Sequence, residues 1–283
     1  MITPANPGII RSPRATQQAL ESSGFEIRTD RTSPATRRQR KIAFGMTSTG
    51  VLSGSETSSE RPSLRIVDLR GPAGRLEALL NEGAPDSHCV GLVCHPHPIG
   101  GGTMHNKVVY HAMKVLNAPE WGFCWPVLRF NFRGTGLSEG QHDGRAESAD
   151  VSAALDWLHA EFKLPVVLIG FSFGAAMAIA AFCGSGPQPK RGTGLRAFIA
   201  LGLPTRGFGH SYQYPVLAEC VLPKLFLSGD GDSFAPTQDL KQVVDTAADP
   251  KHLVLVPGAD HFFTGQLEPM QWSLANWLRE HLQ

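Results

Sequence analysis

The sequence predicts an α/β fold in which a mostly parallel sheet is covered by helices on both faces. From about residue 63, short apolar segments alternate with longer segments whose apolar residues recur at helical spacing. Segments such as Val90 to Cys94 and Pro165 to Gly170 are apolar at almost every position. Strands of this kind are buried on both sides, as in parallel sheets with helices on each face.

The first half of this region predicts a hairpin followed by buried strands and helices. Residues 64–69 and 75–80 alternate apolar with polar positions around Gly71-Pro72, which indicates two antiparallel strands. Short apolar runs predict strands at 90–94 and 126–132. Helical spacing predicts helices at 107–116 and 147–162, the second with its apolar face formed by Val151, Ala154, Leu155 and Leu158.

The second half repeats the strand–helix alternation. Apolar runs predict strands at 165–170, 197–201, 224–228 and 252–256. An alanine-rich stretch predicts a helix at 174–183, and helical spacing predicts two more at 238–246 and 267–282. In open sheets of this type ligands bind at the carboxyl ends of the strands, so we expect the functional residues there.

The first 60 residues differ from the rest in composition. They contain 17 apolar residues against 17 serines and threonines, and the apolar residues show no lasting period. Such a segment buries too little apolar surface to offset its ordering entropy. We predict a disordered tail at 1–60 and one α/β domain at 61–283. The tail has no apolar core of a secretory signal, and its acidic residues argue against an organelle transit peptide without excluding one. Translation from Met46 is a third interpretation.

Composition and charge narrow the classes of molecule that the protein is expected to bind. The formal net charge is +1, so no overall field favours nucleic acid or an anionic membrane. No window approaches the ~18 uninterrupted apolar residues that a spanning helix requires. The five cysteines are odd in number, lack CxxC spacing and lie mainly in or beside apolar runs, which favours reduced, buried thiols and a cytoplasmic protein. The oligomeric state stays open, a homo-oligomer included.

A serine lies between a strand and a helix in the pattern Gly-x-Ser-x-Gly. The residues are Gly170-Phe171-Ser172-Phe173-Gly174. In this context the pattern is typical of a nucleophile on a sharp, strained turn. Glycines two positions before and after Ser172 are expected where neighbouring chain leaves no room for a Cβ. The free N–H groups of the following helix point towards the serine. We therefore predict Ser172 to be a nucleophile rather than a serine in an ordinary turn.

Its partners are expected after later strands. His261 follows the last strand, and no other histidine has this position, so it is the candidate base. Two aspartates follow the strand before it, Asp230 and Asp232. Asp232 lies deeper in its loop and is the favoured partner of His261, while Asp230 is expected to cap the turn or meet solvent. Asp260, the neighbour of His261, is expected to make a turn hydrogen bond.

The loop after strand 90–94 is the candidate oxyanion loop. A serine nucleophile on this turn takes one oxyanion donor from the next residue, the N–H of Phe173, and the other from this loop. Two of the loop residues are prolines and have no N–H. His97 is therefore the first choice of donor and Ile99 the second.

Two other kinds of site use histidines or glycine runs like those of this loop. His95, His97 and His105 do not form a recognised metal-ligand spacing, and prolines stiffen the segment, so no metal is predicted. The glycine run lacks the Lys-Ser/Thr ending of a phosphate-binding P-loop.

Together these residues resemble the α/β-hydrolase superfamily, and more narrowly a group of small predicted serine hydrolases related to dienelactone hydrolases and serine-aminopeptidase-like proteins. The resemblance spans about residues 94–263 and rests on five motifs: His-Pro-His-Pro with a glycine run at 95–102, Arg-Phe-Asn-Phe-Arg-Gly-x-Gly-x-Ser at 129–138, Gly-Phe-Ser-Phe-Gly, Gly-Asp-x-Asp at 229–232 and Ala-Asp-His-Phe-Phe at 259–263. It implies a triad of Ser172, Asp232 and His261. It also implies that the loop around Arg133 is chiefly structural. Dienelactone hydrolases proper use cysteine where this chain has Ser172.

The expected activity is hydrolysis of carboxylic esters through an acyl-enzyme, without metal or organic cofactor. Only about twenty residues, 203–221, lie where lids are commonly inserted, so no large cap domain is expected. Three aromatic residues there predict either an apolar wall for short or medium acyl chains or simple packing onto the sheet: Phe208, Tyr212 and Tyr214. A thioesterase or peptidase with the same triad is the alternative enzyme. A non-catalytic binding protein on this fold is the alternative of another class.

Overall fold

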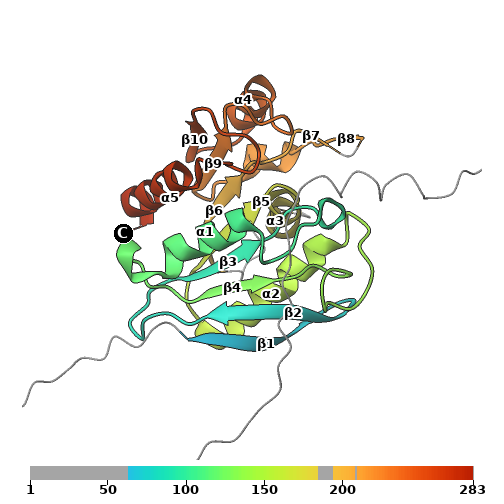
Figure 1. Cartoon of the computed structure of the whole chain (residues 1–283), viewed down its shortest axis with the longest axis vertical. Coiled ribbons are helices and arrows are strands. Elements are labelled where there is room, and N and C mark those ends of the chain that lie inside the picture. Colours follow the sequence, from blue (N-terminus) through green and yellow to red (C-terminus); the bar gives the residue numbers. More distant parts are fainter. Residues whose placement is uncertain (1–62, 184–193, 208, 283) are drawn as a thin grey trace, which may run out of the picture. The chain divides into compact units, whose positions relative to one another are not determined.

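The described residues form an eight-stranded, mostly parallel sheet (Figure 1). The computed structural model describes residues 63–183, 194–207 and 209–282. The strand order is β1-β2-β4-β3-β5-β6-β9-β10, and β2 is antiparallel to both of its neighbours while the pairs from β4 to β10 are parallel. The strand bounds are β1 Leu64–Gly71, β2 Gly74–Asn81, β3 Val90–Cys94, β4 Val127–Phe130, β5 Val166–Phe171, β6 Leu195–Leu201, β9 Lys224–Gly229 and β10 Lys251–Val256.

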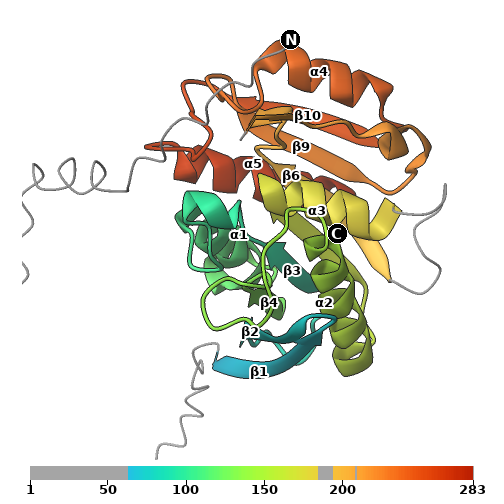
Figure 2. The same cartoon turned by 90° about the vertical axis from the view of Figure 1, so that its right-hand side faces the viewer.

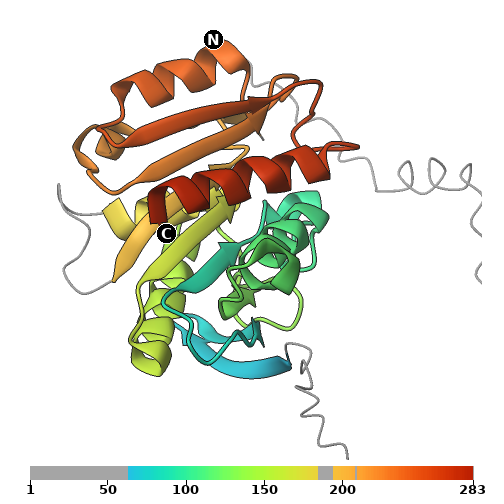
Figure 3. The same cartoon turned by 90° about the vertical axis from the view of Figure 1, so that its left-hand side faces the viewer.

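Helices cover both faces of the sheet. Figure 2 shows α2 and α3 on one side of the strands and α1 and α5 on the other, and Figure 3 views the side with α1 and α5. The helix bounds are α1 Lys107–Asn117, α2 Glu147–Phe162, α3 Phe173–Cys183, α4 Thr237–Thr246 and α5 Leu267–Leu282. The predicted α/β fold with two covered faces is therefore confirmed. Among these helices none combines the length and apolar character needed to cross a bilayer.

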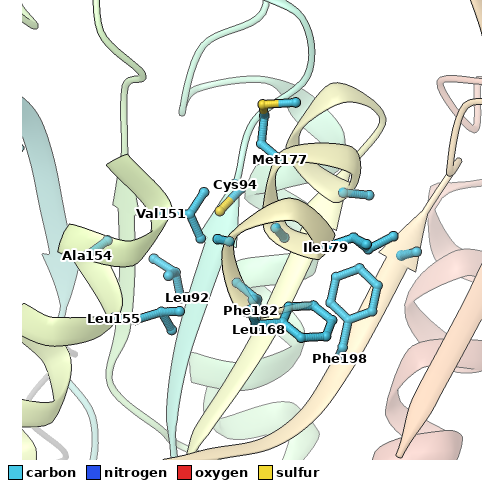
Figure 4. Close-up of a cluster of buried hydrophobic side chains, with 14 of the residues drawn as sticks. Leu92, Cys94, Val151, Ala154, Leu155, Leu168, Met177, Ile179, Phe182 and Phe198 are labelled. Atoms are coloured by element: carbon cyan, nitrogen blue, oxygen red, sulfur yellow. The ribbon is translucent and has the colours of Figure 1, made fainter. Parts of the chain in front are cut away.

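Each face has its own apolar core, because the buried strands point alternate side chains to opposite sides. Figure 4 shows the core beneath α2 and α3, where Leu168 and Phe198 of the sheet pack against Leu155 and Phe182 of the helices. Valines of α1 and leucines of α5 pack on the opposite face. Both faces of β5 are thus covered, which explains why its sequence is apolar without alternation.

Two details differ from the sequence prediction. The strand expected at 126–132 ends at Phe130, because the N–H of Phe132 donates to Nε2 of the His95 side chain at 3.0 Å instead of pairing with a strand. A short hairpin of β7 (Arg206–Gly207) and β8 (His210–Ser211) was not predicted, since two-residue strands carry no readable period.

The segment between β6 and β9 contains no cap domain in its described part. Besides the β7–β8 hairpin, it has one 3₁₀ helix, Pro215–Glu219. This agrees with the prediction from its length. The prediction of a disordered tail at 1–60 lies outside the described residues.

A buried ion pair joins the loop after β4 to the first turns of α2. Arg133 Nη2 lies 2.7 Å from Asp150 Oδ1, with side-chain exposures of 9% and 0%. Asp150 also accepts the Nε–H of Arg133 and the backbone N–H of Arg133, at 3.0 Å and 3.1 Å. These hydrogen bonds raise the pKa of Arg133 above its usual value. Arg133 therefore fixes the loop, in agreement with the structural role that the family resemblance implies.

Replacing Asp150 by alanine is expected to lower the free energy of unfolding by about 3 kcal/mol, because removal of one partner leaves the other charge buried and unpaired. Urea unfolding measures the change. Asp68→Ala is the matched control, since its pair with Arg70 is largely exposed and should change stability little. Equal losses in the two variants would contradict this role of the pair.

A fully buried histidine ties the loop after β3 to the end of β4. His95 is 0% exposed. Its Nδ1–H donates to Pro96 O at 2.7 Å, and its Nε2 accepts from Phe132 N–H at 3.0 Å. Burial, the largest cause, lowers the pKa of His95 to about 4 from its ordinary 6.5, against the opposing effect of the Pro96 hydrogen bond. The imidazole is therefore neutral, and it links the two segments through one hydrogen bond on each ring nitrogen.

The low pKa of His95 predicts a loss of stability in acid. Between pH 6.5 and pH 4 the unfolded chain binds a proton that the folded chain does not, so the free energy of unfolding falls as pH is lowered. The fall attributable to His95 is about 3 kcal/mol across that window. Urea unfolding of wild type and His95→Gln from pH 7 to pH 4 measures it. The variant should show the smaller decline, whereas the exposed-site control His105→Gln should follow wild type.

Candidate active site

The strand–turn–helix around Ser172 has the strained geometry that its sequence predicts. Ser172 follows β5 directly, has φ of 54°, and donates its N–H to Leu201 O on β6 at 2.9 Å. A Cβ on Gly170 would lie 2.4 Å from the Cα of Ala175, and one on Gly174 would lie 2.5 Å from Cys94 O. Only glycine fits at either position. The close packing holds the turn and places the serine hydroxyl at the carboxyl end of β5.

Three predicted residues meet in one hydrogen-bonded chain. Ser172 Oγ lies 2.8 Å from His261 Nε2, and His261 Nδ1 lies 2.8 Å from Asp232 Oδ2. The carboxylate can only accept, so Nδ1 carries the proton and Nε2 accepts from the serine hydroxyl. All three residues are buried, at 8%, 5% and 2% exposure. They come from the carboxyl ends of β5, β9 and β10, as the parallel topology predicts.

The carboxylate of Asp232 is held by its own loop. Oδ1 accepts the N–H groups of Phe234 and Ala235, at 2.8 Å and 3.1 Å, and Oδ2 accepts the Ser228 hydroxyl at 3.0 Å. These donors come from β9 and the turn after it. They fix the carboxylate so that Oδ2 faces the imidazole of His261.

The two competing aspartates have turn contacts instead. Asp230 Oδ1 accepts the N–H of Gly258 at 2.8 Å, which links the loops after β9 and β10. Asp260 Oδ1 accepts the N–H groups of Thr264 and Phe262, and these hydrogen bonds lower the pKa of its carboxyl. Asp260 therefore makes the expected turn hydrogen bonds, whereas Asp230 is exposed, as one of its two expectations had it, and contacts another loop instead of capping its own turn.

Aromatic rings surround the imidazole of His261, and sequence reasoning did not identify them. The rings of Phe234, Phe171 and Phe262 lie 4.6, 5.2 and 5.2 Å from it between centroids. On another side a Cβ at Gly202 would approach the imidazole to 3.2 Å. The ring is thus confined to one orientation. Phe171 and Phe262 adjoin residues already singled out, but nothing in the sequence marks Phe234.

The candidate oxyanion loop turns back beside the serine. Gly102 N–H bonds His97 O at 3.0 Å, and a Cβ on Gly102 would lie 2.2 Å from Pro96 O, so the loop returns tightly on itself. The N–H of Ile99, the second choice of oxyanion donor, donates to His97 Nδ1 at 3.2 Å and is therefore already hydrogen-bonded in this arrangement. Phe173 is the first residue of α3, where a helix supplies no acceptor for its N–H.

A cleft of about 750 Å³ opens beside these residues. It is lined by His97, Ile99, His142, Asp143, Gly144, Arg145, Phe173, Ser211, Tyr212 and Gln213. Most of the lining residues are polar, so of the predicted apolar wall only Tyr212 appears here. Tyr214 is buried with its hydroxyl on Pro204 O, and Phe208 lies outside the described residues.

The three histidines of the loop region do not form a metal centre. Within the part of the chain that the structure describes, no three His, Cys, Asp or Glu side chains gather to hold a metal ion. His95 instead has two hydrogen-bonding partners, and His97 packs its ring on Phe173 at 4.6 Å.

Comparisons with known proteins agree with the α/β fold. No family model matches the chain. An uncharacterised protein of Rickettsia prowazekii is 35% identical over 223 residues, 75% of this chain and 87% of that protein. An α/β serine hydrolase homologue from Coxiella burnetii superimposes with a TM-score of 0.63 at 30% identity, covering 76% of this chain and 96% of that one.

A second solved structure is similar over the same region. It is an α/β serine hydrolase without a lid from Xanthomonas campestris, with a TM-score of 0.64 and 28% identity over 77% of this chain and 94% of that one. Both similarities cover nearly the whole length of the solved chains, one of an α/β serine hydrolase and the other of a homologue of such enzymes. The chain therefore belongs to the α/β-hydrolase superfamily.

Proposed function

We propose that the protein hydrolyses carboxylic esters of short or medium acyl chain through an acyl-enzyme, with Ser172, His261 and Asp232 as its catalytic residues. The observation that carries the proposal is the unbroken chain from Ser172 Oγ through both imidazole nitrogens to Asp232 Oδ2, with 2.8 Å at each link. This arrangement gives a hydroxyl a base that is already oriented and already in the required tautomer.

In the first half of the reaction Ser172 Oγ attacks the ester carbonyl carbon while its proton moves to His261 Nε2. Asp232 stabilises the imidazolium that forms. The tetrahedral intermediate collapses as His261 returns the proton to the leaving alkoxide, which releases the alcohol and leaves an acyl-serine.

In the second half water takes the place of the alcohol. His261 removes a proton from water, whose oxygen attacks the acyl carbon, and then protonates Ser172 Oγ as the acyl bond breaks. The products are a carboxylic acid and the restored serine, so ester and water balance acid and alcohol. The three side chains, the ester and water account for every bond and proton in the two halves.

The negative charge of the tetrahedral intermediate needs donors near Ser172. The backbone N–H groups of Phe173 and His97 are the proposed pair. Phe173 starts the helix that follows the serine, and His97 lies against the Phe173 ring. The positive end of α3 adds to the stabilisation of the developing charge.

A proline at position 97 tests the loop donor. His97 has φ of −56° and ψ of 126°, a conformation that proline adopts, so His97→Pro removes the N–H with little backbone strain. His97→Ala is the matched control, because it removes the imidazole and retains the N–H. We expect kcat of the proline variant to fall about 10²-fold or more below that of the alanine variant on the same ester. Equal rates would contradict His97 as a donor.

An ester substrate is favoured over an amide on two grounds. The cleft has no cap domain over it in the described residues, which leaves it open to small substrates. An alcohol is also a better leaving group than an amine and requires less assistance. Thioesters also have a better leaving group than amides and would follow the same catalytic steps, so they are the alternative to be compared directly.

Replacement of Ser172 tests the activity itself. Wild type is expected to hydrolyse 4-nitrophenyl acetate and butyrate faster than an acyl-CoA or an aminoacyl amide, and Ser172→Ala should lose about 10⁴-fold or more of kcat. Spectrophotometric assays measure both. A fluorophosphonate probe should label wild type and not the variant. Absence of label on folded wild type, as judged by circular dichroism, would overturn the proposal.

A further inference from the structure

A second histidine lies in the cleft beside the candidate oxyanion loop. His142 lines the cleft, and its ring packs 4.9 Å from that of His97 and 5.5 Å from that of Phe173. Phe173 is the residue after Ser172. The imidazole of His142 is therefore one aromatic ring away from the turn that carries Ser172, on the wall of the cleft.

The buried carboxylate of Glu147 contacts the imidazole of His142. His142 Nδ1 lies 2.6 Å from Glu147 Oε1, at ion-pair distance but without the alignment of a regular hydrogen bond. The side chains are 14% and 0% exposed. Glu147 Oε1 also accepts the N–H of Asp143 at 2.9 Å. Glu147 is the first residue of α2, where the helix dipole favours its negative charge.

The short contact favours one tautomer of the imidazole. A carboxylate 2.6 Å from Nδ1 of His142 favours the form that carries its hydrogen on Nδ1, beside the negative charge of Glu147. In the neutral imidazole Nε2 then has a lone pair and accepts a hydrogen bond. The ring thus offers the cleft an acceptor in a fixed orientation.

Packing alone does not explain this pair. A phenylalanine at position 142 would make the same ring contacts with His97 and Phe173 without a buried carboxylate. Burying Glu147 carries a desolvation cost, and its Oε2 is buried with no hydrogen-bond partner among the described residues. An arrangement with that cost is expected where the imidazole must be oriented for a contact of its own.

We propose that His142, oriented by Glu147, is a substrate-binding residue that accepts a hydrogen bond from a hydroxyl group of the ester. The proposal rests on the proposed esterase function and names its substrate class: esters that carry a hydroxyl group near the scissile bond, in preference to plain alkyl esters. The cleft is lined by apolar surface as well as by polar side chains, which suits an ester that carries a hydroxyl group. A lone pair on Nε2 accepts from a hydroxyl and repels a carboxylate.

Matched ester pairs test the preference. On the acyl side, kcat/KM is compared for 4-nitrophenyl 3-hydroxybutyrate and 4-nitrophenyl butyrate; on the alcohol side, for 2-hydroxyethyl butyrate and propyl butyrate. Mono-4-nitrophenyl succinate represents a carboxylate. Wild type should prefer the hydroxyl member of one pair by about 10-fold, the value of one well-placed hydrogen bond. The pair that shows the preference identifies the side of the scissile bond.

Variants then assign the preference to His142. His142→Phe should abolish it, whereas His142→Gln, whose amide oxygen can still accept, should retain part of it. Glu147→Gln should weaken it by loosening the imidazole. His159→Gln, at an exposed position of α2, is the matched control and should keep the wild-type ratio. Thermal melting of each variant identifies any loss of fold, and the two His142 variants make the test independent of either one alone.

Three results would overturn the inference. One is a wild-type enzyme that does not discriminate within either pair, and another is a preference for the succinate ester. The third is an equal loss on both members of a pair in His142→Phe, which would indicate a role in bracing the loop only. Fluorophosphonate labelling at Ser172 separates these results from failure of the proposed function: a labelled enzyme without hydroxyl preference refutes only the role of His142.

Discussion

The candidate site depends on the close packing of the turn that carries Ser172. The chain must reverse between β5 and α3 within one residue, and that residue has φ of 54°. Such strain persists only where the surroundings enforce it. Here the enforcement is steric: Gly170 lies against the start of α3, and Gly174 lies against the carbonyl that ends β3. The hydroxyl is held out of the sheet by contacts that no other residue type would permit at those two positions.

Around this turn, buried polar groups connect loops that apolar packing alone would leave unspecified. His95 joins the loop after β3 to the end of β4, and Asp150 joins Arg133 to α2. The carboxylate of Asp232, which faces His261, accepts three hydrogen bonds from β9 and the turn after it. Each group is costly to bury without its partners. A single arrangement satisfies them together, so the strand ends are held in the relative positions that the proposed chemistry needs.

Sequence reasoning succeeded where a local pattern has one structural meaning. The unbroken apolar runs predicted the parallel strands, and Gly-x-Ser-x-Gly between a strand and a helix predicted the turn at Ser172. Position after the last strand indicated His261, and depth in the preceding loop favoured Asp232 over Asp230; the structure places both in hydrogen-bonding contact with Ser172 or with each other. Sequence reasoning failed where a distant contact decides the structure, and where an element is too short to show a period. The strand at 126–132 ends early because His95 takes the N–H of Phe132, and the hairpin at Arg206–Ser211 is too short to show a period.

The sequence by itself determined the fold class, the strained serine and the order of its partners, because these follow from periodicity, glycine sterics and position along the chain. Only the tertiary structure decided the surroundings of that serine. Phe234 beside His261, the engaged N–H of Ile99 and the His142–Glu147 pair depend on loops that approach from different strands. Contacts between such loops depend on distances in three dimensions. They produce no periodic pattern in a single sequence, so sequence reasoning does not detect them.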